Sequence, residues 1–358
     1  MKIKTIHSIW TTLAVVLFLP MSQAVVAQES GADVEIRPLF DSHDLLSVRI
    51  EAPLTTLLKK KPEDEYLDGT FSYTGADGQE HSLDLKLQTR GRYRRQRTTC
   101  NFPPIRLNFR KKQVKGTDFA GQDKLKLVTH CQTKRKNFEQ LIMREYLAYR
   151  ILQTLTDNSF GARMMQITYV NSEKNGDELT KYGFVIEDED DIGKRLGLTA
   201  TKLNGIKAHE LNPKQANLIS VYEYLIGNTD FSLILGPADS SCCHNAVLFS
   251  DGGAPYTPIP YDFDFSGLVD APYAEPNPRF KLRSVKTRLY RGRCMNNELL
   301  DETFAYYLEK QPEIRQLVAD LEMLDDKNRK EVTRYLDAFY EDISDPKVKQ
   351  RKFVTKCS

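Results

Sequence analysis

Residues 224–267 contain most of the polar side chains from which a function can be predicted. Their sequence is YLIGNTDFSLILGPADSSCCHNAVLFSDGGAPYTPIPYDFDFSG. An apolar helix end leads into a polar loop at Asn228-Thr229-Asp230. The segment that follows has no regular pattern and ends at His244-Asn245. Two predicted short strands follow, Ala246–Phe249 and Tyr256–Tyr261, and the second leads into Asp262-Phe263-Asp264. Because a hairpin would bring these polar ends together, the stretch predicts a functional site built on loops.

The residue types suggest a division of labour. Phosphoryl transfer uses a carboxylate to orient the attacking hydroxyl, and an amide and a second carboxylate to hold Mg²⁺. Asp230, Asn245 and Asp262 occur in that order, and Asp264 can assist. Acids of this kind also occur in ordinary turns, where the side chain bonds nearby backbone N–H groups, so a purely structural role stays open.

The stretch resembles the catalytic core of the spore-coat CotH kinases and the HipA-type kinases. Their G-N-x-D loop, following Asn and late Y/W-D-x-D turn match Gly227–Asp230, Asn245 and Tyr261–Asp264, although fourteen residues separate Asp230 from Asn245 where those families have a handful. The resemblance implies an α+β, two-lobed protein-kinase-like fold, with an antiparallel β N-lobe holding one long helix and a mainly helical C-lobe with a short β-hairpin at the active site. It also implies ATP as the nucleotide and Mg²⁺ or Mn²⁺ as the metal.

The N-terminus has the layout of a secretory signal peptide. Lys2 and Lys4 precede an apolar run from Leu13 to Met21, and small residues follow up to Ala27. The apolar run is shorter than the roughly 20 residues that span a membrane. We therefore expect residues 1–27 to be removed and the mature chain to be exported, periplasmic or secreted, without a membrane span. Their removal takes away two lysines and no acids, which leaves a formal net charge of zero and argues against bulk binding to nucleic acid.

The chain contains six cysteines, an even number that favours disulfides in an oxidising compartment. We expect Cys100 to pair with Cys131, because each adjoins a predicted strand of the same sheet, and one of Cys242 and Cys243 to pair with Cys294. Zinc binding is the competing interpretation, although the chain has no C-x-x-C pair.

The first half of the chain reads as short strands. The residues Ser82–Gln88 alternate strictly between polar and apolar, which is typical of a half-buried strand. The predicted strands are Val34–Leu39, Leu46–Ala52, Gly69–Thr74, Ser82–Thr89, Ile105–Phe109, Leu125–Thr129, Met164–Val170 and Tyr182–Ile186. We expect an antiparallel N-terminal sheet and a boundary near residue 190, which gives lobes of residues 28–190 and 191–358.

Cations and an acid of the N-terminal half could hold nucleotide phosphates. The basic run Arg90–Arg97 is either a phosphate-covering loop or a solvated hairpin, and its Arg90-Gly91 resembles the CotH pattern before the nucleotide-binding Lys. A helix predicted from Asn137 to about Thr156 carries Glu145 in the middle of an apolar stripe, and a buried carboxylate is costly unless it is paired. Kinases pair a strand Lys with a helix Glu, so we expect Lys126 to bind Glu145. Arg106 is the alternative cation, because its strand resembles the Lys-bearing strand of the CotH kinases.

The second half of the chain is expected to be helical. Asn212-Pro213 is a strong helix start, and the helix would run to Ile226 and deliver Asp230. Three amphipathic helices are predicted at Asn297–Glu309, Pro312–Leu324 and Lys327–Ile343.

The functional hypothesis is an exported atypical kinase that transfers the γ-phosphate of ATP to a hydroxyl of an unknown protein or small-molecule acceptor. Asp230 would orient the acceptor, Asn245, Asp262 and Asp264 would hold the metal, and Lys126, Glu145, Arg106 and Arg90 would place the phosphates. Two alternatives stay open. One is a catalytically inactive binding or structural protein of the cell envelope, which the insertion before Asn245 favours, and the other is a metal-dependent hydrolase that uses His244, Asp262 and Asp264.

Overall fold

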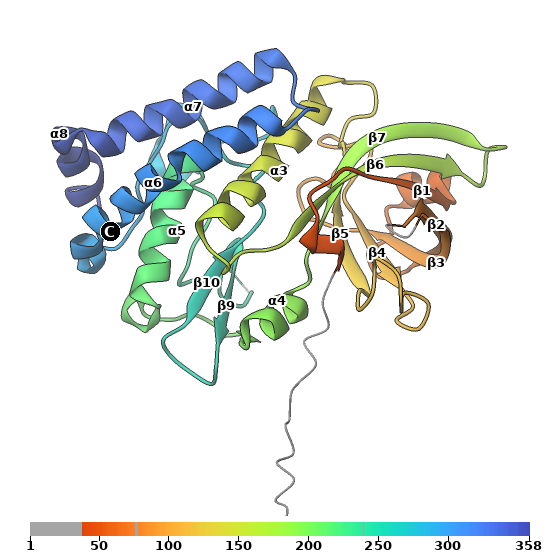
Figure 1. Cartoon of the computed structure of the whole chain (residues 1–358), viewed down its shortest axis with the longest axis horizontal. Coiled ribbons are helices and arrows are strands. Elements are labelled where there is room, and N and C mark those ends of the chain that lie inside the picture. The colour runs from red at the N-terminus through yellow and green to blue at the C-terminus, as the bar shows by residue number, and fades with distance from the viewer. Residues whose placement is uncertain (1–37, 76–77, 239) are drawn as a thin grey trace, which may run out of the picture. The chain divides into compact units, whose positions relative to one another are not determined.

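Seven strands close into a barrel that forms the right-hand part of Figure 1. The computed structural model describes residues 38–75, 78–238 and 240–358. The strands are β1 (Leu46–Ala52), β2 (Leu67–Thr74), β3 (Glu80–Thr89), β4 (Ile105–Phe109), β5 (Lys124–Val128), β6 (Ala162–Asn171) and β7 (Asp177–Ile186). Around the barrel their order is β1-β2-β3-β4-β5-β7-β6, and β6 pairs again with β1.

The alternation of apolar and polar residues explains why these strands curve around one interior. In β3, Leu83, Leu85 and Leu87 are buried while Asp84 and Lys86 are exposed, so one face of the strand lines the core. The same interior contains Phe71, Phe109 and Phe119, whose rings meet at centroid distances of 5.0 to 5.4 Å. The apolar face of each strand therefore packs against the other strands of the barrel.

The expected fold class, a two-lobed protein-kinase-like fold with an antiparallel β N-lobe, is wrong. The barrel is closed and mixed, because β1 pairs in parallel with β6 from Leu46–Met165 to Ala52–Asn171 while the other neighbouring strands run antiparallel. Closure removes the two free edges that an open sheet would expose. The alternation within a strand cannot predict which distant strand it meets.

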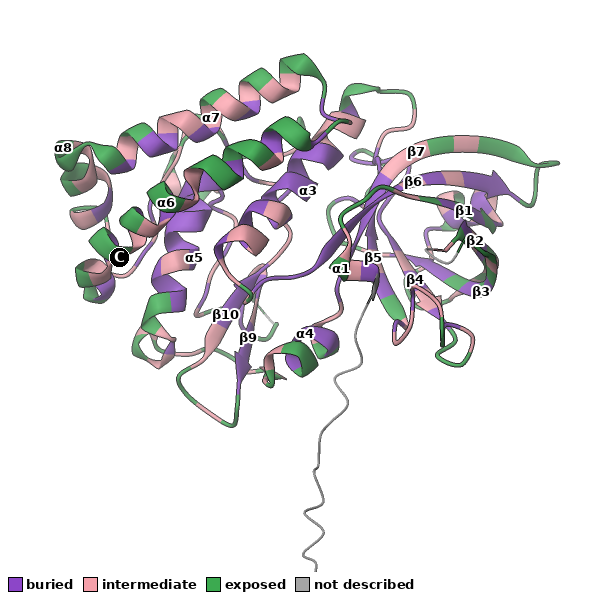
Figure 2. Ribbon diagram, viewed as in Figure 1, coloured by how far each residue is buried: buried purple, intermediate pink, exposed green. Residues whose placement is uncertain are grey.

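Helices and a small sheet complete the structure (Figure 1). A three-stranded sheet has the order β10-β9-β8. Its strands are β8 (Thr199–Thr201), β9 (Ala246–Ser250) and β10 (Thr257–Pro260), and the helices are α1 (Pro38–Asp41), α2 (Leu54–Lys60), α3 (Asn137–Leu155), α4 (Glu189–Leu196), α5 (Pro213–Ile226), α6 (Leu300–Asp320), α7 (Asp326–Ser344) and α8 (Pro346–Lys349). A second apolar core joins α3, α5, α6, α7 and β9, and Figure 2 shows that α3 and α5 are buried along most of their length.

Helix α5 begins and ends where the sequence predicts. The side chain of Asn212 accepts a hydrogen bond from the backbone N–H of Gln215, and Pro213 occupies the first turn. The helix ends at Gly227, which has a φ of 66°. A Cβ on Gly227 would clash with the Tyr335 hydroxyl, so a larger residue would have to displace that side chain as well as adopt a positive φ. This end of α5 delivers the loop that contains Asp230.

Other expectations about helices and strands have mixed outcomes. The long helix α3 begins at Asn137, the residue expected to cap it, although Lys136 holds the capping position. The two helices expected on either side of Pro312 are one continuous helix, α6. The buried side chains of Phe304, Tyr307, Ile314 and Val318 lie on both sides of that proline and hold the helix against the core. The signal peptide and most of the strand expected at Val34–Leu39 lie outside the described residues, and Leu39 itself is helical. The boundary expected near residue 190 falls in the first turn of α4 and stays a prediction.

Three disulfides bond all six cysteines. Cys100 and Cys131 are bonded with their Cα atoms 4.6 Å apart, which confirms that pairing. The pairing expected between Cys294 and the Cys242-Cys243 pair is wrong: Cys242 bonds Cys243, and Cys294 bonds Cys357. The reason is that the C-terminus returns to this segment, where the N–H of Ser358 donates to the carbonyl of Gly292 at 2.9 Å. In the described part of the chain, no helix has the length and apolar character needed to cross a membrane.

Candidate functional site

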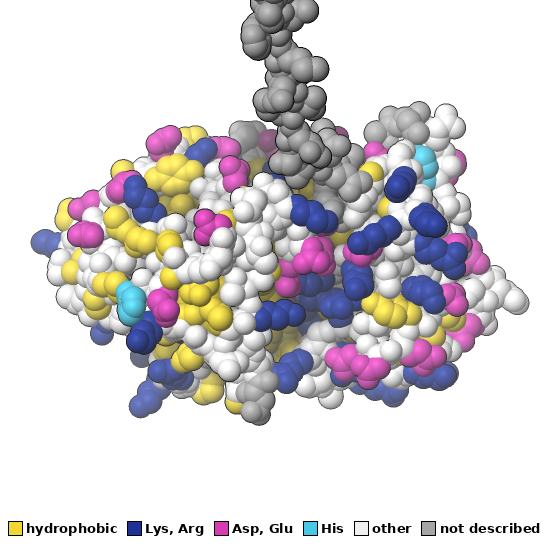
Figure 3. Space-filling model, turned by 90° about the horizontal axis from the view of Figure 1, so that it is seen from below, with side chains coloured by type: hydrophobic (Ala, Val, Ile, Leu, Met, Phe, Trp, Pro, Cys, Tyr) yellow, Lys and Arg dark blue, Asp and Glu magenta, His cyan; other side chains and the backbone are white. Residues whose placement is uncertain are grey.

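A cleft of about 340 Å³ lies between the basic loop after β3 and the small sheet. The residues that line it include the cations Arg92 and Lys202, the acid Glu189, and His244, Asn245 and Tyr261. On the face shown in Figure 3, Lys and Arg side chains gather around a hollow. A cleft of this size is in the range of small-molecule sites, and its cations favour an anionic ligand.

Asp230 lies behind this cleft in a hydrogen-bonded group with His244 and Asn245. One carboxylate oxygen of Asp230, Oδ1, lies 2.9 Å from Nε2 of His244. The side-chain amide of Asn245 donates to the other oxygen, Oδ2, at 3.1 Å and to the Asp230 carbonyl at 2.7 Å. The hydrogen bond that the Asp230 carboxylate accepts raises the pKa of His244, and burial opposes that shift only in part. The structure therefore brings together the predicted residues Asp230 and Asn245 and adds His244 to them.

The insertion between Asp230 and Asn245 folds back on itself, and this return explains how the two residues meet. Ser232 and His244 exchange backbone hydrogen bonds of 2.9 and 3.1 Å, which pairs the two ends of the insertion. Asn245 has a φ of 52°, a left-handed conformation that Asn tolerates better than most residues. The length of the insertion therefore does not separate Asn245 from Asp230.

A second group of acids surrounds the guanidinium of Arg94. Nη1 of Arg94 lies 3.0 Å from Oε2 of Glu145, Nη2 lies 2.8 Å from Oδ1 of Asp262, and Nε lies 3.2 Å from Oδ2 of Asp264. The side chains of Glu145 and Asp264 are 2% and 5% exposed, whereas that of Asp262 is 37% exposed. We name these residues, Arg94, Glu145, Asp262 and Asp264, the Arg94 cluster.

The charges of the Arg94 cluster do not balance if all three acids are ionised. Burial raises the pKa of Asp264 to about 8 and raises that of Glu145, although Arg94 opposes both shifts. Burial disfavours the charge of Arg94 as well, but the three surrounding carboxyl groups outweigh that effect and raise its pKa. One guanidinium cannot neutralise all three carboxylates, and the two buried acids, Glu145 and Asp264, hold protons more tightly than they would in water.

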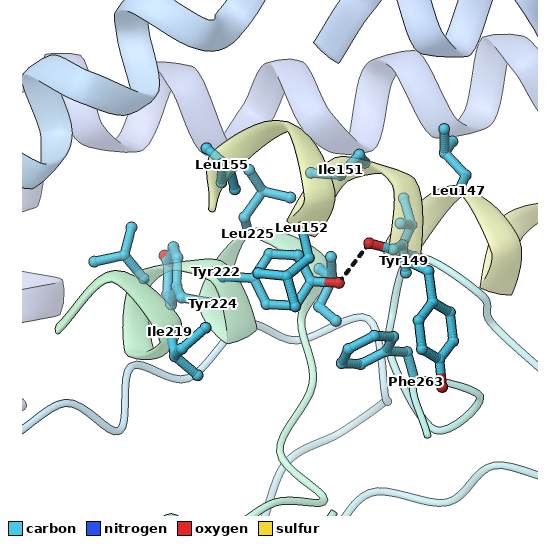
Figure 4. Packing of buried hydrophobic residues seen from close by; sticks show 14 of the residues in the cluster. Leu147, Tyr149, Ile151, Leu152, Leu155, Ile219, Tyr222, Tyr224, Leu225 and Phe263 are labelled. Atoms are coloured by element: carbon cyan, nitrogen blue, oxygen red, sulfur yellow. Dashed lines mark hydrogen bonds between the residues drawn. The ribbon is translucent and has the colours of Figure 1, made fainter. Parts of the chain in front are cut away.

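Side chains of helices α3 and α5 hold the turn Asp262-Phe263-Asp264 in place. The ring of Phe263 packs between Tyr149 and Tyr222 at centroid distances of 4.7 and 5.4 Å, as Figure 4 shows. The Tyr149 hydroxyl accepts a hydrogen bond of 2.9 Å from the N–H of Asp262, and the Tyr222 hydroxyl donates to the carbonyl of Ala148 at 2.7 Å. With Phe263 held in the core, Asp262 and Asp264 on either side of it both reach Arg94.

The expected ion pair between Lys126 and Glu145 is wrong. Lys126 instead lies 2.9 Å from Glu189 and 5.2 Å from the ring centroid of Tyr261. Arg106 is the register partner of Lys126 across β4 and β5, so both side chains leave the barrel on the same face, but Glu145 is bonded to Arg94 rather than to either of them. The physical reason is that Glu145 lies deep in the core on α3, where the loop after β3 reaches it.

Arg90 begins that loop and lies near the Arg94 cluster. Its N–H donates to the carbonyl of Pro104 at 2.9 Å. Burial lowers the pKa of Arg90, and the neighbouring carboxylate of Asp262 opposes that shift. The sequence allowed two interpretations of this loop, a cover over phosphates or a solvated hairpin. In the structure its arginines point in two directions, with Arg92 at the cleft and Arg94 in the interior.

The residues expected to hold Mg²⁺ or Mn²⁺ do not fit that role in this structure. Within residues 38–75, 78–238 and 240–358, no three His, Cys, Asp or Glu side chains are grouped so that they could hold a metal ion. Asp262 and Asp264 are both bonded to Arg94, and the amide of Asn245 is directed at Asp230. The hydrolase alternative fails for the same reason, because His244 bonds Asp230 rather than joining Asp262 and Asp264.

Sequence analysis missed the roles of Arg94 and of two residues under the Asp230 loop. Glu223, buried in α5, has its pKa raised to about 8 by burial. Arg291 donates to the carbonyl of Thr229 at 3.0 Å and also to that of Phe231, so it holds the backbone on both sides of Asp230. The buried position of Glu145 indicated that some cation must pair with it. The loop after β3 is irregular, however, so no periodicity identifies which of its arginines points inward.

Comparisons with known proteins give no relative: no protein-family model matches the chain, and no curated protein sequence is significantly similar to it.

Proposed function

We propose that the protein is a phosphotransferase that binds the phosphates of ATP in the cleft and passes the terminal phosphoryl group to a hydroxyl. The observation that carries this proposal is the group of Asp230, His244 and Asn245 at the wall of a cleft that also contains Arg92 and Lys202. Phosphoryl transfer needs positive charge around the moving group and a positioned acceptor hydroxyl, and this arrangement offers both.

The proton of the acceptor goes to the Asp230–His244 pair. Asp230 holds Nε2 of His244, which leaves Nδ1 of the ring to accept the hydroxyl proton as the oxygen attacks phosphorus. The new O–P bond forms while the bond from the terminal phosphorus to the bridging oxygen breaks, and ADP leaves with that oxygen. Arg92 and Lys202 balance the charge on the phosphate oxygens.

A second candidate is a protein that binds the phosphorylated ligand without transferring phosphate. The Arg94 cluster favours this alternative, because two of the carboxylates expected to hold the metal are bonded to a guanidinium. Both candidates act in an exported protein in our proposal, and the three disulfides support that location, since such bonds persist in oxidising compartments.

The test measures binding and transfer separately on the oxidised chain. Thermal shift and calorimetry with ATP, in EDTA and with Mg²⁺ or Mn²⁺, report binding, and labelled-phosphate transfer to the protein or to added hydroxyl compounds reports turnover. We expect Asp230→Asn and His244→Gln to lower transfer by roughly 10² to 10⁴ while ATP still binds. His209→Gln, at an exposed histidine away from the cleft, is the matched control and should change neither quantity.

Each outcome decides between the candidates. Binding of ATP that Arg92→Ala weakens, together with transfer that Asp230→Asn lowers by roughly 10² or more, supports the phosphotransferase. ATP binding without transfer to any acceptor, in any variant, supports the binding protein. A wild-type chain that binds no ATP under all three conditions overturns both.

A further inference from the structure

Residues 279–293 contain seven Lys or Arg side chains and no acid. Some of these cations hold the fold, since Arg288 donates to backbone carbonyls at the end of α5 and Nζ of Lys286 lies 2.6 Å from Oδ2 of Asp270. Three others form no ion pair and no side-chain hydrogen bond with any described residue, and we name them the basic surface: Arg279, Lys281 and Arg283. The fold itself does not use their charge.

The basic surface is exposed to solvent. Arg279, Lys281 and Arg283 are all exposed, whereas Phe280 and Leu282 between them are half-buried. Apolar side chains therefore face the protein at alternate positions, and the three cations face outward. Three like charges within five residues raise the local positive potential, so an anionic partner is attracted to this segment.

Contacts of Arg291 attach the basic surface to the loop that contains Asp230. The Arg291 guanidinium lies over the rings of Phe280 and Phe231, at 4.7 and 4.6 Å from their centroids, and it also donates to the backbone on both sides of Asp230. Burial lowers the pKa of Arg291 to about 10, and the charge of Arg279 contributes to that shift. The basic surface therefore lies beside the Asp230 loop.

The position and chemistry of the basic surface favour an acidic peptide. None of its three residues lines the cleft, where Arg92 and Lys202 are assigned to the phosphates, so it is a separate place for a negatively charged partner. Carboxylates bind guanidinium groups in bidentate pairs. Phe280 and Leu282 offer apolar contacts to the side chains of a peptide, whereas no aromatic ring of this segment is exposed enough for a nucleic-acid base to stack on it.

We propose that the basic surface docks the acceptor, and that the acceptor hydroxyl belongs to a serine or threonine in a protein segment rich in Asp and Glu. This inference rests on the proposed phosphotransfer and adds the chemical class of the acceptor. Carboxylates of that segment pair with Arg279, Lys281 and Arg283 and hold the hydroxyl beside Asp230 and His244. The hydroxyl oxygen attacks the terminal phosphorus of ATP, its proton passes to His244, and ADP leaves.

The experiment measures binding of a short labelled peptide, in which Asp and Glu residues flank one serine, by fluorescence anisotropy with the full oxidised chain and no nucleotide. We expect wild type to bind this peptide, with an affinity that falls as salt is added. The combined variant Arg279→Ala, Lys281→Ala and Arg283→Ala should raise Kd at least about tenfold. The matched control combines substitutions of three exposed cations of the barrel, and it should keep the wild-type Kd: Lys112→Ala, Lys115→Ala and Lys124→Ala.

Several results would overturn the proposal. One is wild-type protein that does not bind the acidic peptide, or that binds equally well a peptide with Asn and Gln in place of Asp and Glu. Another is an equal Kd for the two combined variants, because the cations of the barrel would then serve as well as the basic surface. Binding of a single-stranded oligonucleotide or of anionic phospholipid vesicles through the basic surface, without binding of the peptide, rules out a peptide as the occupant.

This inference and the proposed function can fail separately. A chain that binds the acidic peptide but no ATP keeps the docking surface and overturns the phosphotransferase. A chain that transfers phosphate to small hydroxyl compounds but binds no acidic peptide overturns the docking surface alone. Where both proposals hold, the combined variant of the basic surface should raise KM for the serine peptide at least about tenfold and leave kcat close to that of wild type.

Discussion

Two hydrogen-bonded groups lie near each other in this molecule, one around Asp230 and one around Arg94, and the partners of their acids differ in kind. Asp230 has a side chain that is 33% exposed, and it bonds an imidazole and an amide beside the cleft. Glu145 and Asp264 are almost completely buried, and they share the guanidinium of Arg94. An imidazole can release or accept a proton near neutral pH, whereas a guanidinium stays charged. The comparison indicates that the first group is suited to chemistry and the second to holding the structure together.

The strongest test of this difference removes the shared cation. We expect Arg94→Met to lower the free energy of unfolding by about 3 to 5 kcal/mol, the usual result when one partner of a buried charge pair is lost. Arg95→Met should cost less than about 1 kcal/mol, because its ion pair with Glu63 is at the surface. Denaturant unfolding of both oxidised variants measures the two effects, and similar losses would show that the Arg94 cluster has no special structural role.

The second prediction concerns pH and Glu223, which is buried under the Asp230 loop. Its pKa rises from 4.5 to about 8 on folding, first because of burial, while Asn228 and Arg291 oppose the shift. The folded state holds this proton more tightly than the unfolded state, so the stability is fully present below pH 4.5 and is lost as the pH rises to about 8. Between about pH 6 and pH 8 the loss should be about 2 kcal/mol.

Glu223→Gln isolates this contribution, because the amide resembles the protonated carboxyl group and does not titrate. We expect the variant to lose less stability than wild type as the pH rises, and the remaining decline to come from Asp264, whose pKa is also raised to about 8. Glu298→Gln changes an exposed acid and should keep the wild-type slope. If Glu223→Gln also keeps that slope, Glu223 is ionised in the folded protein and the stated direction of its pKa is wrong.

Local patterns in the sequence predicted local structure well. The bounds of β1 and β4 were predicted to the residue, and α3 and α5 were close, because the alternation of apolar residues and the Asn-Pro and Gly signals act over a few residues. The pairing of Cys100 with Cys131 followed from their places beside neighbouring strands. For the same reason the sequence identified the Asp230 and Asp262 loops as a candidate site.

The contacts that failed to be predicted are non-local. The parallel pairing of β1 with β6 closes the barrel, and the return of the C-terminus gives Cys294 its partner Cys357. The position of Glu145 in an apolar stripe predicted that a cation would pair with it. The sequence could not show which arginine of the run Arg90–Arg97 would do so, and in the structure it is Arg94. Continuation of α6 through Pro312 likewise depends on packing against the core rather than on helix propensity.

The smallest effect on stability, and the most direct test of the first group, comes from Asp230→Asn. The hydrogen bond that Asp230 accepts is the main cause that raises the pKa of His244 above 6.5, so the variant should lower that pKa. A raised histidine pKa stabilises the folded state below the unfolded value, and the contribution disappears as the pH rises through the folded value. Because both side chains are about one-third exposed, the loss should be under about 1 kcal/mol near pH 5 and close to zero near pH 9.

Nuclear magnetic resonance titration of the imidazole signals of His244 measures this change, with the exposed His209 as the internal control. A lower His244 pKa in Asp230→Asn, with His209 unchanged, is the expected result. If the proposed phosphoryl transfer is detected, its pH profile should follow the same group, because in that proposal His244 accepts the hydroxyl proton and must be neutral to do so. If the pKa of His244 does not change in Asp230→Asn, the 2.9 Å contact between the two side chains has no electrostatic effect on His244. Asp230 would then differ from the acids around Arg94 only in how far it is buried.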